Sequence, residues 1–195
     1  MAVDRDKALA AVRALLEALG YDLRADPELT RTPERVVDAF DRELLGGRHI
    51  DLADLIRTGS SLDESGDREG VVVFEDISVT TVCPHHLMPA QGKALVAYVP
   101  GTHVIGLGRI AKLVDACARR LTLQERIGKE VVDALMRHGG ARGVFCRLSL
   151  VHTCVTARNP GQVGSMVHTV AAGGVLAGAE GYACVSLAVG GALAS

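Results

Sequence analysis

The chain has 195 residues, which suffices for one domain of ordinary size with a hydrophobic core but not for two full domains. Apolar residues make up 48% and charged residues 23%, and no run approaches the roughly 18 apolar residues of a membrane span. The net charge of −2 provides no global basic field for nucleic acid, so any anionic ligand must be held by local charges.

The N-terminal segment MAVDRDKALAAVRALLEALG carries acids among its bases and has a helical pattern, not that of a signal peptide. Five cysteines, an odd number without a secretory signal, favour free thiols or metal ligands over a disulfide framework. We therefore expect a cytosolic protein that neither spans a membrane nor binds nucleic acid.

Two helices are predicted near the N-terminus. Apolar residues at helical spacing predict the first over residues 6–19, ended by Gly20. The second should start at TPERVV, with Thr32 as N-cap and Pro33 in the first helical position, and it should close at Gly46.

The polar, turn-rich stretch 58–70 is typical of a connection. It divides the chain into a helical N-terminal arm with linker, residues 1–70, and a main domain, residues 71–195.

The main domain is predicted to open with a hairpin. Residues 71–83 and 93–100 are rich in β-branched and apolar residues, and the loop between them carries candidate ligands. Helical periodicity then predicts helices over 106–121 and 122–140. The tail is rich in Gly, Ala and Val and could supply closing strands.

The segment GVFCRLSLVHTCV returns to a period of two. If the strand is regular, His152 and Cys154 lie on one face together with Cys146. Cys146 is eight residues from Cys154, roughly 26 Å at strand rise, and therefore cannot share a metal with it.

Metal-ligand residue types gather in two short clusters: Cys83, His85 and His86 in TVCPHHLMPA, and His152 and Cys154 in VHTCVTAR. Zinc prefers thiolate sulfur and imidazole nitrogen; structural sites use four protein ligands and catalytic sites three, with a position left for water. Spacing alone leaves three interpretations open: a closed structural site, a catalytic site with surplus histidines, or unconnected core residues.

Pro84 favours a turn in which Cys83 and His86 converge while His85 points elsewhere. A histidine left outside the metal shell could transfer protons near neutral pH.

Four stretches carry a resemblance to a known family. They are CPHHLMPAQGKALVAYVP, VIGLGRIAKLVDACARR, LQERIGKEVVDAL and LVHTCVTAR, and they occur in the order found in GTP cyclohydrolase I. The match runs from about Thr32 to Gly174, most of the chain.

The resemblance implies an α+β tunnelling fold, in which an antiparallel sheet carries helices on one face, with residues 71–195 as the catalytic domain. It implies a toroidal homo-oligomer, expected to be a decamer, with active sites between subunits. It also implies zinc held by Cys83, His86 and Cys154. The implied reaction is hydrolysis and ring rearrangement of GTP to 7,8-dihydroneopterin triphosphate with release of formate.

The same resemblance assigns roles to the remaining residues. His85 and His152 look like the proton-transfer residues, and Glu125, with Gln124 beside it, looks like the group that binds the guanine edge. The run from Thr122 to Glu125 also has the spacing of a helix capping box, which would give Glu125 a structural role.

Four cations match the family's triphosphate-contacting positions. Arg109, Lys112 and Arg158 match directly, and Arg35 matches a position contributed by a neighbouring subunit.

Departures from the family pattern leave the substrate more open than the chemistry. Pro84 replaces a usual Glu, Gly108 a usual Ser and Val167 a usual Thr, while Arg109 and Lys112 have exchanged cation types. The alternatives are a tunnelling-fold paralogue acting on another purine nucleotide or a pterin, or a zinc-stabilised binding or scaffold protein without turnover.

Overall fold

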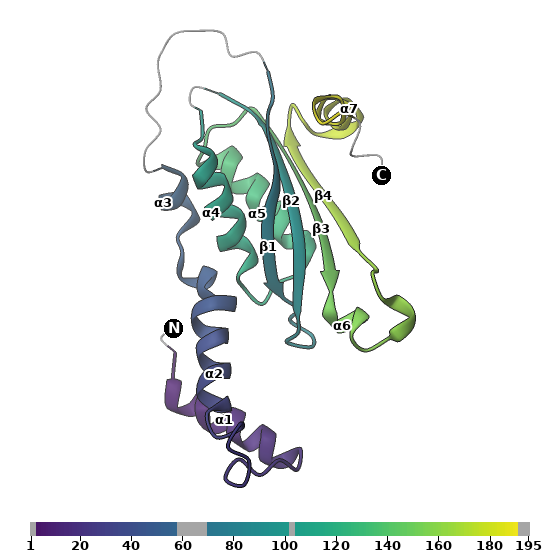
Figure 1. Ribbon diagram of the computed structural model, residues 1–195. Coiled ribbons are helices and arrows are strands. Elements are labelled where there is room, and N and C mark those ends of the chain that lie inside the picture. The colour runs from purple at the N-terminus through teal and green to yellow at the C-terminus, as the bar shows by residue number, and fades with distance from the viewer. Residues whose placement is uncertain (1–2, 58–69, 102–103, 191–195) are drawn as a thin grey trace. The chain divides into compact units, whose positions relative to one another are not determined.

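The structure, a computed structural model, describes residues 3–57, 70–101 and 104–190 (Figure 1). The chain divides into two compact units, residues 1–46 and 47–195. The connection predicted over 58–70, and with it the predicted domain boundary, lies almost wholly outside the described residues.

The first unit is helical. It contains α1 (Arg5–Ala18), α2 (Thr32–Asp38) and the π-helical turn η1 (Ala39–Leu44). Both predicted helices are present, but Thr32 is the first residue of α2 and not its N-cap, which is Arg31. Arg5 on α1 donates a hydrogen bond of 2.8 Å to Asp38 on α2.

The described part of the second unit contains a four-stranded antiparallel sheet in the order β1-β2-β3-β4 (Figure 1). Its strands are β1 (Val72–Val82), β2 (Pro89–Val99), β3 (Gly143–His152) and β4 (Val167–Gly174). The predicted hairpin is β1–β2, and β4 is the strand that the tail supplies.

Helices α4 (Leu107–Ala118) and α5 (Gln124–Arg137) lie between β2 and β3 in the chain and cover one face of the sheet (Figure 1). Their apolar stripes pack on alternate strand residues, because side chains two apart on a strand point to the same face. Val96, Cys146 and Leu148 belong to this core together with Cys117 of α4. The predicted α+β architecture is confirmed.

A helix not predicted from the sequence, α7 (Gly178–Ala188), packs against part of the opposite face. There Val185 joins Leu95 and Phe145, and the rings of Phe145 and Tyr182 meet edge to face at 5.9 Å. A second small core therefore covers one end of the otherwise open face.

The remaining elements are short: η2 (Gly46–His49), α3 (Leu52–Arg57), α6 (Thr153–Thr156) and η3 (Pro160–Gln162). None of the helices in the described ranges is long and apolar enough to cross a membrane.

The sheet register leaves no room for a side chain at Gly92. A Cβ there would overlap the carbonyl oxygen of Ser149 on β3. We expect Gly92→Ala to lower the free energy of unfolding by at least about 1 to 3 kcal/mol, because the paired strands must move apart.

The matched control is Gly108→Ala in α4, where a Cβ would meet no heavy atom within 4 Å. That change should raise the free energy of unfolding by up to about 1 kcal/mol, because alanine loses less conformational entropy in a helix. Urea denaturation at a fixed protein concentration measures both. Equal destabilisation of the two variants would contradict the register.

Candidate metal and catalytic centre

Cys83 directly follows β1 and begins a tight turn. Its N–H donates to the Met88 carbonyl, and its carbonyl accepts from the Leu87 N–H, both at 2.9 Å. Pro84 supplies a fixed φ at the start of this turn, and Leu87 has a φ of +54°. The turn places Cys83 and His86, three residues apart, on the same side, as predicted.

Cys154 lies in the helical turn α6 and not on β3. The predicted continuation of the strand to Cys154 is wrong, because β3 ends at His152. The Thr153 hydroxyl donates to the Pro89 carbonyl at 2.5 Å, and the Thr156 hydroxyl donates back to the His152 carbonyl. These hydroxyl bonds hold the backbone where extended structure becomes helical.

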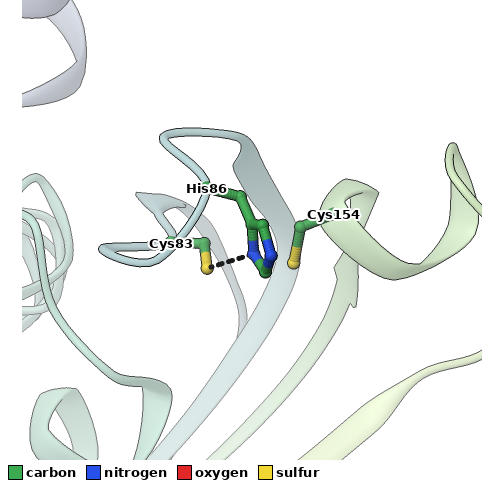
Figure 2. A group of neighbouring side chains, drawn as sticks. All are labelled: Cys83, His86 and Cys154. Atoms are coloured by element: carbon green, nitrogen blue, oxygen red, sulfur yellow. Dashed lines mark hydrogen bonds between the residues drawn. The ribbon is translucent and has the colours of Figure 1, made fainter.

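Figure 2 shows the imidazole of His86 between the thiols of Cys83 and Cys154. The ligand atoms of these three residues all lie within 4.8 Å of one another, and Cys83 Sγ is 3.7 Å from His86 Nδ1. Two sulfurs and one imidazole nitrogen, converging from segments seventy residues apart, form a group that could bind a metal ion.

The electrostatics of the two thiols also favour binding of a cation. Burial raises the pKa of the Cys154 thiol, as do its hydrogen bond and charge interaction with Cys83, while the charge of Arg158 lowers it. Two thiolates this close repel each other unless a cation lies between them. A positive ion bound between the two sulfurs would favour the thiolate form of Cys154.

The two remaining histidines adjoin this cluster. His85 Nδ1 is 3.8 Å from Cys83 Sγ, and its ring meets that of His86 edge to face at 6.3 Å. Among the described residues, the group that could hold a metal ion consists of Cys83, His86 and Cys154 and does not include His85. His152, at the end of β3, lies 2.8 Å from Gln124 Oε1 through its Nε2.

Gln124 is buried, with 3% of its surface exposed, in the first turn of α5. Its Nε2 donates to the Leu148 carbonyl at 3.1 Å and to the Val167 carbonyl at 2.9 Å. Gln124 also borders the pocket, and its amide makes three hydrogen bonds to protein groups. The contact with substrate expected of its side chain stays a prediction.

A pocket of about 350 Å³ joins these groups. The turn at 83–86, the start of α5 and the segment 152–155 line it, with Val167 at its edge. Its volume is at the lower end of the range for small-molecule pockets.

Glu125 lines the pocket and its side chain is exposed. The capping box that would give it a structural role is not formed: the N-cap of α5 is Leu123, without a side-chain cap bond. The Glu125 carboxylate accepts no hydrogen bond from another residue in the part of the chain that the structure describes. It also lies in the first turn of α5, where the helix dipole stabilises negative charge.

Comparison with known proteins then decides the family. Residues 8–182 match the family model described as GTP cyclohydrolase I. The chain belongs to the GTP cyclohydrolase I family. It is 42% identical over 175 residues to GTP cyclohydrolase 1 of Leifsonia xyli subsp. xyli, covering 89% of each chain. It is 41% identical over 176 residues to GTP cyclohydrolase 1 of Brevibacillus brevis, covering 90% of this chain and 91% of the relative.

Among solved structures, the archaeosine synthase QueF-Like in the apo form matches 56% of this chain and 97% of its own, with 18% identity and a TM-score of 0.46. Membership in the family makes the chain an enzyme of the GTP cyclohydrolase I type. The four-stranded antiparallel sheet with its paired helices agrees with the α+β fold expected from the resemblance.

The four cations of the family pattern are dispersed in the structure. The described residues lining the pocket do not include any of them. Arg158 is near enough to Cys154 to lower its pKa. Arg109 donates a hydrogen bond to the Leu55 carbonyl of α3. Along α4, Arg109 lies about 14 Å from the C-terminal end of that helix, the end that approaches the site. Lys112 lies on the same helix.

Arg35 lies on α2, which belongs to the first unit, and the cluster belongs to the second. Among the three cations of the second unit, Arg158 is the one whose charge acts on the cluster.

Sequence reasoning missed the contacts that hold the site together. The hydrogen bonds from His152 to Gln124 and from Thr153 to Pro89 join segments 28 and 64 residues apart. A buried glutamine in an apolar helix face was the one available signal, since a buried amide must find partners.

Removing one thiol tests the cluster. Cys83→Ala should weaken Co²⁺ binding at least about 100-fold, because losing a direct ligand costs more than losing a group that orients one. Titration with Co²⁺, followed by the thiolate-to-cobalt absorption band, measures the affinity.

The control is Cys184→Ala, which removes an exposed thiol on α7. It should leave the band and the affinity unchanged. A Cys83→Ala protein that binds Co²⁺ as tightly as the unmodified chain would contradict the assignment.

Proposed function

We propose that the chain hydrolyses and rearranges GTP to 7,8-dihydroneopterin triphosphate, releasing formate, with zinc at the Cys83–His86–Cys154 cluster. The observation that carries the proposal is the convergence of these three ligands beside a pocket of about 350 Å³ in a chain of this family. The two histidines outside the ligand set border the same pocket.

The donor set fits zinc. Thiolates and imidazoles are the ligands that zinc prefers, and in a tetrahedral shell with bonds of about 2.3 Å to sulfur and 2.0 Å to nitrogen these atoms lie about 3.5 Å apart. The distance of 3.7 Å between Cys83 Sγ and His86 Nδ1 is close to that value. Three protein ligands leave one position open, and zinc bound there would make hydroxide available near neutral pH.

Glu125 is the proposed base-recognition residue. A carboxylate can accept two N–H bonds at once, which suits the ring N–H and amino group of guanine and not the edge of adenine. The Glu125 side chain borders the pocket and forms no capping box, so it is available for this contact.

His85 and His152 are the proposed proton-transfer residues. Ring opening, formate release and ring closure each require a proton to move, and neutral imidazole can accept or donate one near neutral pH. Both side chains line the pocket within a few residues of the proposed zinc ligands.

The triphosphate requires cations that one chain does not bring together. We assign Arg158 to the same chain and Arg109, Lys112 and Arg35 to neighbouring subunits of a toroidal homodecamer. Arg109 supports this assignment, because it is at the far end of α4 from its own chain's cluster.

The outer edge of the sheet at β4 supports assembly of several subunits. The outer strand β4 exposes Val167 and Val170 and carries no Lys, Arg, Asp or Glu, the residues that commonly protect an edge from pairing.

The assay that tests the function is formate release from GTP by the zinc-loaded protein. One formate should appear for each dihydroneopterin triphosphate, detected by its absorbance, and chelation of zinc should stop both. His152→Ala should lower the rate at least about 100-fold, as expected for loss of a general acid–base residue.

His138→Ala, which changes an exposed histidine at the end of α5, is the control and should retain the rate. Release of no formate from GTP would refute the proposal. Testing GDP, GMP and guanosine in the same assay shows how far the triphosphate is required.

Sharing of sites between subunits can be tested with two inactive variants. Oligomers of Arg109→Ala alone or His152→Ala alone should have little activity. If each site takes these residues from two different subunits, a random 1:1 mixed oligomer should recover about a quarter of the unmodified rate. Co-expression with two affinity tags isolates the mixed oligomers. No recovery would show that Arg109 acts on the site of its own chain.

A further inference from the structure

The hydrogen bonds of Gln124 determine the orientation of its amide. Its neighbours are the carbonyl oxygens of Leu148 and Val167 and the Nε2 of His152. Carbonyl oxygens only accept hydrogen bonds, so the amide NH₂ must face them with its two donors. The reversed amide would place an oxygen against two oxygens in a site that is 3% exposed.

This orientation leaves Oε1 facing His152 Nε2 at 2.8 Å. An amide oxygen can only accept, so Nε2 must carry a hydrogen. Turning the imidazole over would place a ring carbon opposite Oε1 and leave a buried oxygen without a donor, which costs about 1 to 3 kcal/mol.

We propose that Gln124 is a positioning residue that holds His152 as the Nε2–H tautomer, which makes Nδ1 the nitrogen that exchanges protons with the substrate. The role of Nδ1 in exchanging protons with the substrate rests on the proposed function. The Nε2–H tautomer of His152 does not depend on it. A proton taken from the substrate enters at the Nδ1 lone pair and leaves from the same atom, because Nε2–H stays bonded to Gln124.

The hydrogen-bond partner of His152 is an amide and not a carboxylate, so Gln124 can also donate hydrogen bonds. Its two donors hold the Leu148 carbonyl of β3 and the Val167 carbonyl at the start of β4. A carboxylate could accept from Nε2 but could not donate to these carbonyls. The Val167 contact uses the backbone, so it does not depend on the threonine that the family usually has there.

The experiment is solid-state ¹⁵N NMR of the zinc-loaded protein labelled at histidine, with His152→Asn identifying the resonances of His152. We expect a protonated Nε2 and an unprotonated Nδ1. Gln124→Leu, which removes the acceptor, should release the ring into a mixture of tautomers. Gln124→Glu, which keeps an acceptor, should retain Nε2–H.

A kinetic measurement separates positioning from substrate binding. Gln124→Leu should lower kcat at least about 10-fold with KM for GTP changed less than about 2-fold, because the lost interaction acts on proton transfer and not on binding. Glu125→Gln should instead raise KM.

An Nδ1–H tautomer in the unmodified protein would overturn the inference, whatever the variants do. So would Gln124→Glu behaving like Gln124→Leu in the spectrum, because a purely structural amide predicts that the two variants are alike. If the Nε2–H tautomer is found but no formate is released from GTP, the proposed function fails and the tautomer assignment stands.

Discussion

The antiparallel register of β1, β2 and β3 is the constraint on which the site depends. Val82 pairs with Pro89 at the end of the first hairpin, and Ala90 pairs with His152 across the next pair of strands. The turn carrying Cys83 therefore lies beside the turn carrying Cys154, although 70 residues of chain separate them. A slip of one residue between β2 and β3 would turn His152 to the opposite face of the sheet.

The helices inserted between β2 and β3 complete the site by bringing α5 over the ends of β3 and β4. There the Gln124 amide bonds to three groups on two strands, β3 and β4, and the direction of each bond is determined by donor and acceptor chemistry. His152, the proposed proton-transfer residue, thus contacts the same buried group that ties the helix to the sheet. Packing and chemistry are coupled at this point, as expected where a site is built on rigid elements.

Much of this arrangement could be predicted from local signals. Period-two and period-3.6 patterns located the hairpin and both long helices, and they placed Cys117 in the core. Residue chemistry identified five candidate ligands, and the choice of Cys83, His86 and Cys154 among them came from the family resemblance. The cluster geometry supports that choice.

What could not be predicted depends on contacts between distant segments. The period-two pattern extended β3 to Cys154, because periodicity cannot register the hydroxyl bond from Thr153 to Pro89 that ends the strand. The tail's composition gave no sign of α7, whose apolar residues follow no clear helical stripe and whose partners are Leu95 and Phe145 on other strands. The family resemblance assigned Gln124 to the substrate, and nothing local in the sequence shows that its amide also bonds to Leu148, Val167 and His152.

The central claim is that the three-ligand cluster is an open zinc site. X-ray absorption spectroscopy at the zinc edge tests it most directly. The account predicts two sulfur ligands at about 2.3 Å, one imidazole nitrogen and one lighter non-imidazole ligand that is replaced when substrate binds. A closed shell of two sulfurs and two imidazoles, unchanged by GTP, would contradict it and assign the metal a structural role.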